Sequence, residues 1–129
     1  MIELTLPYPP SVNNYKRVGR LTKTKNGKLY QPRVNTNETN MFYFQVAMRV
    51  RDEGLKIYRD ETISLEVHMD VYPPDHRARD VDNIIKPCLD SLQRAGVIAN
   101  DFQIARLVVQ RCEIIPQGLI KLRIMPSGT

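Results

Sequence analysis

The feature that most constrains the fold is a predicted strand that runs directly into a highly charged loop. Apolar and polar residues alternate from Ile63 to Val71, which predicts a β-strand with one buried face. Tyr72-Pro73-Pro74 ends this strand, and residues 77–82 read R-A-R-D-V-D. A helical pattern follows over residues 84–94 and stops before Gly96. The charged loop is therefore expected between a strand and a helix.

The rest of the sequence predicts three more strands and one more helix. In chain order, these elements are expected at residues 2–6, 37–53, 104–115 and 119–125. Strands interspersed with two main helices predict a single α/β (α+β) domain over residues 1–129, with a mixed β-sheet packed against the helices. At 129 residues the chain is long enough to bury a core without added cross-links.

Apolar side chains of the first helix, at Met41, Phe44, Ala47 and Met48, share one side of the predicted helix. We expect this side to face the core or a dimer interface. Thr36 or Asn37 is expected to cap the helix, because either side chain can accept a hydrogen bond from the first turn.

Composition and segment patterns bear on where the protein works. Cys88 and Cys112 stand apart, without a C-x-x-C motif, which predicts free thiols in a reducing compartment. The N-terminal residues lack the pattern of a signal peptide. No apolar run approaches the roughly 18 residues that a membrane span requires. The sequence therefore predicts a cytoplasmic protein with no membrane partner.

Positive charge is concentrated near the N-terminus. The chain has 19 basic and 14 acidic residues, a net charge of +5, yet no acidic residue lies between Leu4 and Asn37. The basic residues of this segment are Lys16, Arg17, Arg20, Lys23, Lys25, Lys28 and Arg33. Asn26-Gly27 predicts the tight turn of a hairpin within it. The pattern suits an arm that contacts nucleic acid, and also a solvated basic loop without a role.

Three aspartates bracket the second predicted helix. Asp80 and Asp82 precede it, two residues apart, so their side chains point the same way in an extended chain. Asp101 follows it and shares a site with them only if the chain returns along the helix, which we expect. Carboxylate oxygens are the ligands that Mg²⁺ prefers. Lys86, one turn after Asp82, can neutralise a phosphate or orient the attacking water, and Asn83 is expected to cap the helix.

Simpler structural roles are also open for several of these residues. A D-x-D pair before a helix is often only a cap with a solvated neighbour. Asp90 is spaced for helix-surface ion pairs with Lys86 and Arg94. His76 is either a proton shuttle or an ordinary polar loop residue. Arg77 suits an anionic substrate, as does Arg79.

The longest motif covers residues 77–104, which read R-A-R-D-V-D-N-I-I-K-P-C-L-D-S-L-Q-R-A-G-V-I-A-N-D-F-Q-I. This stretch resembles the signature of the RusA family of Holliday-junction resolvases, with its R-x-D-[LV]-D-N-[LI]-x-K core and its D-x-Q-[IV] return. Residues 6–15, L-P-Y-P-P-S-V-N-N-Y, are similar to the start of that family. The resemblance therefore covers nearly the whole chain.

The resemblance implies a homodimeric, Mg²⁺-dependent endodeoxyribonuclease, with Mn²⁺ able to substitute. Such enzymes resolve four-way DNA junctions by paired nicks that leave 5′-phosphate ends, prefer to cut beside a CC dinucleotide, and are often encoded by phages or prophages. The family's catalytic, metal-binding carboxylates fall on Asp80, Asp82 and Asp101. Its essential lysine falls on Lys86 and a supporting arginine on Arg79.

Two departures from the family pattern affect the predicted site. Asn100 stands where the family often has a second acid, which leaves Asp101 as the one ligand candidate there. The arginine run is diluted to H-R-A-R, so DNA binding is expected to depend on Arg77, Arg79 and the basic segment together. The alternatives are a nuclease for other branched DNA and a non-catalytic protein that binds DNA by its structure.

Overall fold

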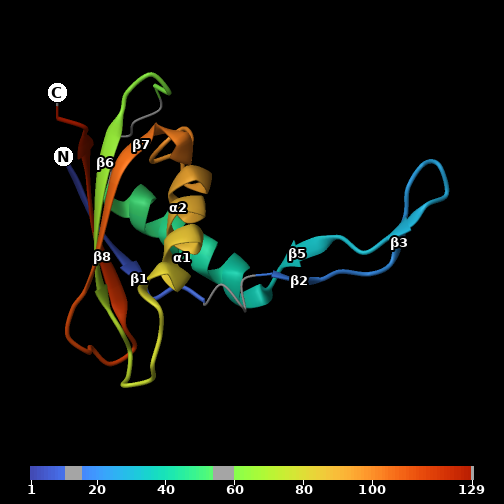
Figure 1. The fold of residues 1–129 in the computed structure, drawn as a ribbon, viewed down its shortest axis with the longest axis horizontal. Coiled ribbons are helices and arrows are strands. Elements are labelled where there is room, and N and C mark those ends of the chain that lie inside the picture. The colour runs from blue at the N-terminus through green and yellow to red at the C-terminus, as the bar shows by residue number, and fades with distance from the viewer. Residues whose placement is uncertain (11–15, 54–59, 129) are drawn as a thin grey trace.

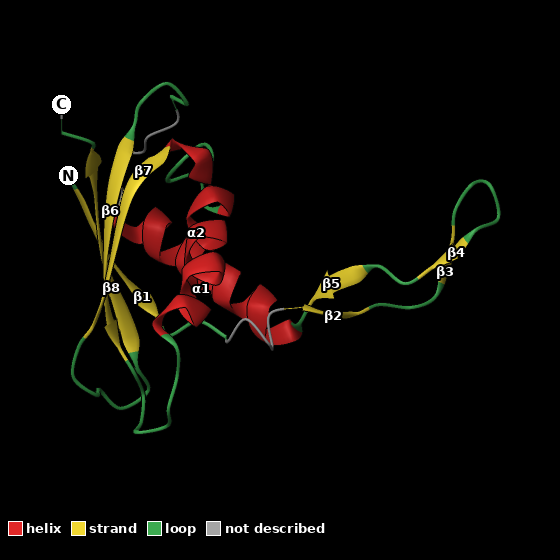
Figure 2. Cartoon of the chain, viewed as in Figure 1, coloured by secondary structure: helices red, strands yellow, loops and turns green. Residues whose placement is uncertain are grey.

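The protein has a sheet layer, a helix layer and an arm that projects from them (Figure 1). A computed structural model describes residues 1–10, 16–53 and 60–128. Both helices lie on one face of the sheet, and the arm extends away from the body (Figure 2). This arrangement confirms the predicted α+β class.

The sheet has four strands in the order β1-β8-β6-β7. The strands are β1 (Ile2–Pro7), β8 (Leu119–Pro126), β6 (Leu65–Tyr72) and β7 (Ile104–Arg111). β8 is antiparallel to β1 and β6, whereas β6 and β7 are parallel, so the sheet is mixed as predicted. The strand predicted to continue to Ile115 ends at Arg111.

The two main helices are α1 (Asn37–Glu53) and α2 (Ile85–Arg94). The Thr36 hydroxyl oxygen accepts a hydrogen bond from the backbone N–H of Thr39 at 3.2 Å, which confirms Thr36 as the cap of α1. Gly96 follows α2 with a φ of 80°, a left-handed conformation that suits glycine and ends the helix as predicted.

The buried side of α1 differs from the predicted one. Phe42 and Val46 are 3% and 0% exposed and pack in the core. Met41, Phe44 and Met48 are 58%, 63% and 36% exposed, so this side does not face the core, and its alternative role in a dimer interface stays a prediction. The helix carries two apolar stripes, and the sequence pattern does not distinguish the one that meets the sheet.

The connection from β6 to β7 positions the candidate site. Parallel strands require a crossover, and this one contains the 3₁₀ turn η2 (Val81–Ile84), then α2, then the 3₁₀ turn η3 (Asp101–Gln103). Leu65 pairs with Ile104 at the start of the two strands, and Val71 pairs with Arg111 at their end. Consequently, the crossover leaves from one end of the sheet and returns to the other.

The basic segment forms the arm. Its short strands pair as β2 (Lys16–Val18) with β5 (Arg33–Asn35), and as β3 (Thr22–Lys23) with β4 (Leu29–Tyr30). Gly27 has a φ of 80° in the turn between β3 and β4, which confirms the predicted hairpin.

Two further predictions concern thiols and membranes. Cys88 is buried and Cys112 is partly buried, and both are free, as expected. Among the described residues, no helix combines the length and apolarity needed to cross a membrane.

Candidate nuclease site

The loop between β6 and η2 is organised around Asp75. Its carboxylate accepts hydrogen bonds from two guanidinium nitrogens of Arg79, at 2.7 Å and 3.1 Å, and from the backbone N–H of Arg77 at 2.9 Å. These donors, chiefly the Arg79 side chain, lower the pKa of Asp75 to about 2. This role of Asp75 could not be predicted from the sequence, because a spacing of four residues between an acid and a base is informative only in a helix.

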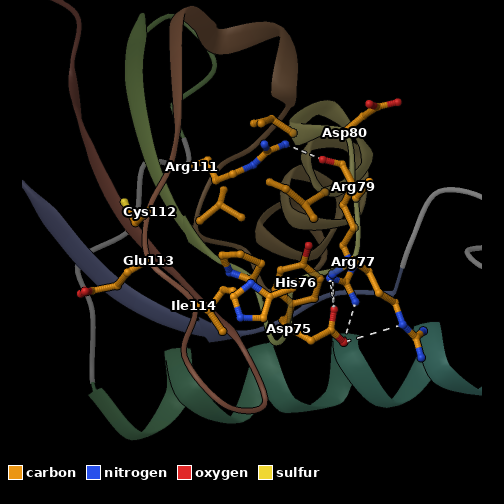
Figure 3. A pocket seen from close by; sticks show the side chains of 15 residues that line it. Asp75, His76, Arg77, Arg79, Asp80, Arg111, Cys112, Glu113 and Ile114 are labelled. Atoms are coloured by element: carbon orange, nitrogen blue, oxygen red, sulfur yellow. Dashed lines mark hydrogen bonds and ion pairs between the residues drawn. The ribbon is translucent and has the colours of Figure 1, made fainter.

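Arg111 ties this loop to the sheet. The last residue of β7, Arg111, donates a hydrogen bond from Nη2 to the backbone carbonyl of Arg79 (Figure 3). The guanidinium carbon of Arg79 also lies 5.9 Å from the ring centroid of Tyr8. Burial raises the pKa of Tyr8, so its hydroxyl remains protonated. Arg79 is therefore held by its side chain and its backbone, immediately before Asp80.

Asp80, Asp82 and Lys86 lie together at the N-terminal end of α2. Asp80 precedes η2 and Asp82 belongs to it, and both are exposed. Asn83 lies inside η2, so the prediction that it caps the helix is wrong; the extra 3₁₀ turn moves the start of α2 to Ile85. Lys86, whose side chain is 63% exposed, has its Nζ 3.5 Å from a carboxylate oxygen of Asp90, which confirms that ion pair.

Asp101 lies beyond the other end of α2. The ten residues of α2 span about 15 Å at 1.5 Å per residue. The seven steps along β7, from beside η3 to Arg111, span about 23 Å at 3.3 Å per residue. In the described part of the chain, no three His, Cys, Asp or Glu residues are grouped to hold a metal ion. A single chain therefore does not make the expected return.

The chain after α2 fails to double back because it is anchored in the core. Val97 and Ile98 are 0% and 1% exposed. The Gln103 side chain accepts hydrogen bonds from the backbone N–H groups of Ala99 and Asn100, and donates to backbone carbonyls just before β6. These contacts fix η3, and with it Asp101, at the start of β7.

The donor atoms at Asp80 and Asp82 suit a hard divalent cation. Among the described residues, neither carboxylate is within ion-pair distance of a basic side chain, so their oxygens are not engaged by Lys86 or the arginines. Two carboxylates and solvent leave room for a further oxygen ligand. Asp101 is also exposed and forms no ion pair in the described part of the chain.

The arm extends away from the body (Figure 1) and carries most of the basic residues of the N-terminal segment. Arg17, Arg20, Lys23, Lys25 and Lys28 are all exposed. Lys16 and Arg33 belong to the paired strands at the base of the arm. The arm therefore has the charge and the reach expected for contacts with a nucleic-acid backbone.

Together, an acid pair with free oxygens, a nearby lysine and a basic arm define a protein of the class that acts on nucleic-acid phosphodiesters. Comparison with known proteins gives the family. The sequence profile described as Endodeoxyribonuclease RusA matches residues 6–124, and the chain belongs to this family.

Similarity to curated relatives extends over nearly the full length of each chain. The crossover junction endodeoxyribonuclease of Enterobacteria phage HK97 is 33% identical over 122 residues, covering 95% of this chain and 92% of the relative. Its counterpart in Escherichia coli strain K12 is 33% identical over 128 residues, covering 97% and 94%. The enzyme of Enterobacteria phage 82 is 32% identical with the same coverage.

Proposed function

We propose that this chain is a crossover junction endodeoxyribonuclease, which resolves four-way DNA junctions by hydrolysing phosphodiester bonds. The names of its full-length relatives support the substrate. The observation that carries the proposal is the exposed pair Asp80 and Asp82, whose carboxylate oxygens are not engaged by the cations around them. That arrangement suits hydrolysis assisted by a divalent cation rather than attack by a protein nucleophile.

The positions of the site residues support the following proposed roles. Asp80, Asp82 and Asp101 are proposed to hold Mg²⁺, with Mn²⁺ able to substitute. When bound, the cation lowers the pKa of a coordinated water and stabilises negative charge on phosphate oxygens. Lys86 places a positive charge beside the phosphate, at the same end of α2 as the acid pair. Arg79, fixed by Asp75, orients the DNA backbone next to Asp80.

The position of Asp101 supports a homodimer, in which the complete site would take residues from two chains. When a two-fold axis runs perpendicular to an elongated element, the element lies antiparallel to its copy in the partner. Each end of the element is then beside the opposite end of the copy. Asp101 lies at one end of α2 and β7, and Asp80 and Asp82 lie at the other, so such an axis would bring them together across two chains. β7 is an edge strand of the sheet, which leaves this side open to a second copy.

A two-fold symmetric enzyme also suits the substrate. A four-way junction must be cut in two symmetry-related strands, and a dimer with two composite sites presents two equivalent centres. The arms of both subunits would add contacts with the phosphate backbone of the junction. These contacts would come from Lys16, Arg17, Arg20, Lys23, Lys25, Lys28 and Arg33. Arg77 and Arg79, in the loop between β6 and η2 (the site loop), would contact the same backbone.

The relatives come from bacteria and from bacteriophages. We therefore place this chain's activity in the bacterial cytoplasm, where its DNA substrate is found, with a bacterial or phage gene as its source.

The decisive experiment incubates the protein with a synthetic four-way junction and, separately, with a linear duplex and a flapped duplex of related sequence. Each substrate is tested with and without Mg²⁺. We expect paired nicks in the junction only when Mg²⁺ is present, with ends that ligase can rejoin. Cleavage of the flap in preference to the junction would indicate a nuclease for other branched DNA. Junction binding without any cleavage would indicate a binding protein.

A further inference from the structure

A cavity of about 410 Å³ lies beside the acid pair, between the site loop and the segment that follows β7. Apolar side chains from three separate parts of the chain contribute to its lining, among them Tyr8, Ile84 and Ile114. Asp80 belongs to the same lining, and Figure 3 shows its carboxylate directed away from the cavity. The cavity is therefore adjacent to the proposed reaction centre but separate from it.

Three arginines contribute to the cavity lining, beside the polar residues Asp75, His76, Asp80 and Glu113, and they differ in how strongly they are already paired. Arg79 is held by Asp75 through two hydrogen bonds. Arg77 contacts Asp75 only at 4.0 Å and its side chain is 83% exposed. Arg111 gives one N–H to the Arg79 carbonyl and retains its other donors. Arg77 and Arg111 can therefore bind an anion without breaking the two hydrogen bonds between Arg79 and Asp75.

Size and chemistry together restrict what the cavity can receive. Its volume is within the range of about 300–1,000 Å³ that is typical of small-ligand pockets. A lining that combines apolar and aromatic side chains with guanidinium groups suits an occupant with a flat apolar part and an attached anion. A nucleotide has both, and the DNA that reaches Asp80 supplies nucleotides at this point.

We propose that this cavity receives an unstacked nucleobase of the DNA, from a nucleotide adjacent to the bond that is cut, with Arg77 and Arg111 on its phosphate. The inference rests on the proposed function and deepens it, because it gives the site a means to distinguish a junction from a duplex. A base in continuous duplex must be unpaired and unstacked before it can enter, which costs a few kcal/mol. A base at the exchange point of a junction has already lost part of its stacking.

The first test measures base insertion without cleavage. Four-way junctions carry 2-aminopurine at one of the nucleotides that flank the exchange point, and the protein is added in the absence of divalent cations. We expect the fluorescence to change strongly at one position with the wild-type protein, because the base leaves its stack. Ile114→Phe, which enlarges a side chain in the lining, should suppress the change. Met48→Phe, an equivalent enlargement on α1 and outside the cavity, should not.

The second test links insertion to the reaction. Ile114→Phe should slow cleavage of the ordinary junction by about tenfold, in line with the stacking free energy of one base. On a junction with an abasic residue at the responsive position, Ile114→Phe and the wild-type protein should cut at equal rates, because no base needs to enter. Ile114 is 38% exposed after the end of β7, and unfolding curves will verify that the substituted protein is folded.

Three results would overturn the proposal. One is an unchanged fluorescence at every flanking position, and another is an Ile114→Phe protein that cuts both junctions like the wild type. The third result concerns a second copy of the chain as the occupant of the cavity. Phe102, beside Asp101, is 91% exposed and is the side chain of that copy to test. If Phe102→Ala and Ile114→Phe both dissociate the dimer without DNA, the cavity receives a second copy of the chain instead. The fluorescence experiment needs no cleavage, so it remains interpretable even if the wild-type protein fails to cut junctions.

Discussion

The carboxylate of Asp75 accepts two hydrogen bonds from the guanidinium of Arg79, at 2.7 Å and 3.1 Å, within the loop that leads to Asp80. This fork fixes both the side chain and the direction of the backbone one residue before the acid pair. The arrangement explains how an exposed loop can hold the proposed catalytic groups in a defined position.

The ion pair between Asp75 and Arg79 should make the melting temperature of the protein depend on pH. The pKa of Asp75 is lowered from 3.8 to about 2, so the pair's contribution is complete above the unfolded value and is lost as the pH falls between these two values. The difference in melting temperature between the wild type and Asp75→Asn should be constant above about pH 5 and disappear near pH 2. A difference that grows on acidification would contradict the assignment.

Asp80→Asn should abolish cleavage while preserving DNA binding. We expect the rate to fall by about three orders of magnitude, because the amide is a poor ligand for a hard cation. Junction affinity should be unchanged or higher, since a negative charge near phosphate is removed. Single-turnover cleavage and a cation-free binding assay measure the two quantities separately. Cleavage by Asp80→Asn at the wild-type rate would show that Asp80 does not belong to the catalytic site.

Mixing two inactive variants tests the composite site. Asp80→Asn and Asp101→Asn should each be inactive alone, but a mixed dimer would contain one site with all three aspartates intact. Equal amounts, allowed to exchange subunits, should recover single nicks without full resolution of the junction. Asp80→Asn mixed with Asp82→Asn is the matched control and should recover nothing, because each site then retains a defect. Equal behaviour of the two mixtures would show that each site is built from one chain.

Lys86 should affect the rate more than the affinity. Its side chain is 63% exposed and its Nζ lies 3.5 Å from Asp90, so Lys86→Gln removes a mobile positive charge without disturbing the core. We expect cleavage to slow by about a hundredfold, in the range found when one electrostatic contact with the transition state is lost. Asp90→Asn serves as the control, since it retains Lys86 and removes only its partner. A loss confined to binding would mean that Lys86 serves to hold the DNA.

The arm should govern the salt dependence of binding. Replacing Lys23, Lys25 and Lys28 with glutamine should weaken junction binding. It should also reduce the slope of log K against log salt by up to about 2.7, at about 0.9 per phosphate contact. Lys121→Gln with Arg123→Gln, which removes exposed charges from β8, is the control outside the arm. An unchanged slope after the triple replacement would mean that the arm does not touch phosphate.

Local patterns predicted the elements of this fold well, because their causes are local. Alternation over residues 63–71 identified β6 within two residues, and Gly96 marked the end of α2 because its left-handed backbone suits glycine. Asn83 was misassigned because a 3₁₀ turn separates the loop from α2, and the helical pattern does not reveal such a turn.

Relationships between distant segments were harder to predict. The place of Asp101 depends on the parallel pairing of β6 with β7, which the sequence of neither strand specifies. The hydrogen bond from Arg111 to Arg79 spans 32 residues and depends on the same pairing. Residue type therefore identified the candidate ligands, while tertiary structure determined that one chain does not bring them together.

The crossover between β6 and β7 has a further consequence for how the nicking activity depends on protein concentration. On the composite-site proposal, a solitary chain is fully folded yet catalytically incomplete, so nicking at low protein levels should rise with the square of concentration. Monomers would leave chromosomal DNA intact, and incision would begin only after two copies have formed a dimer.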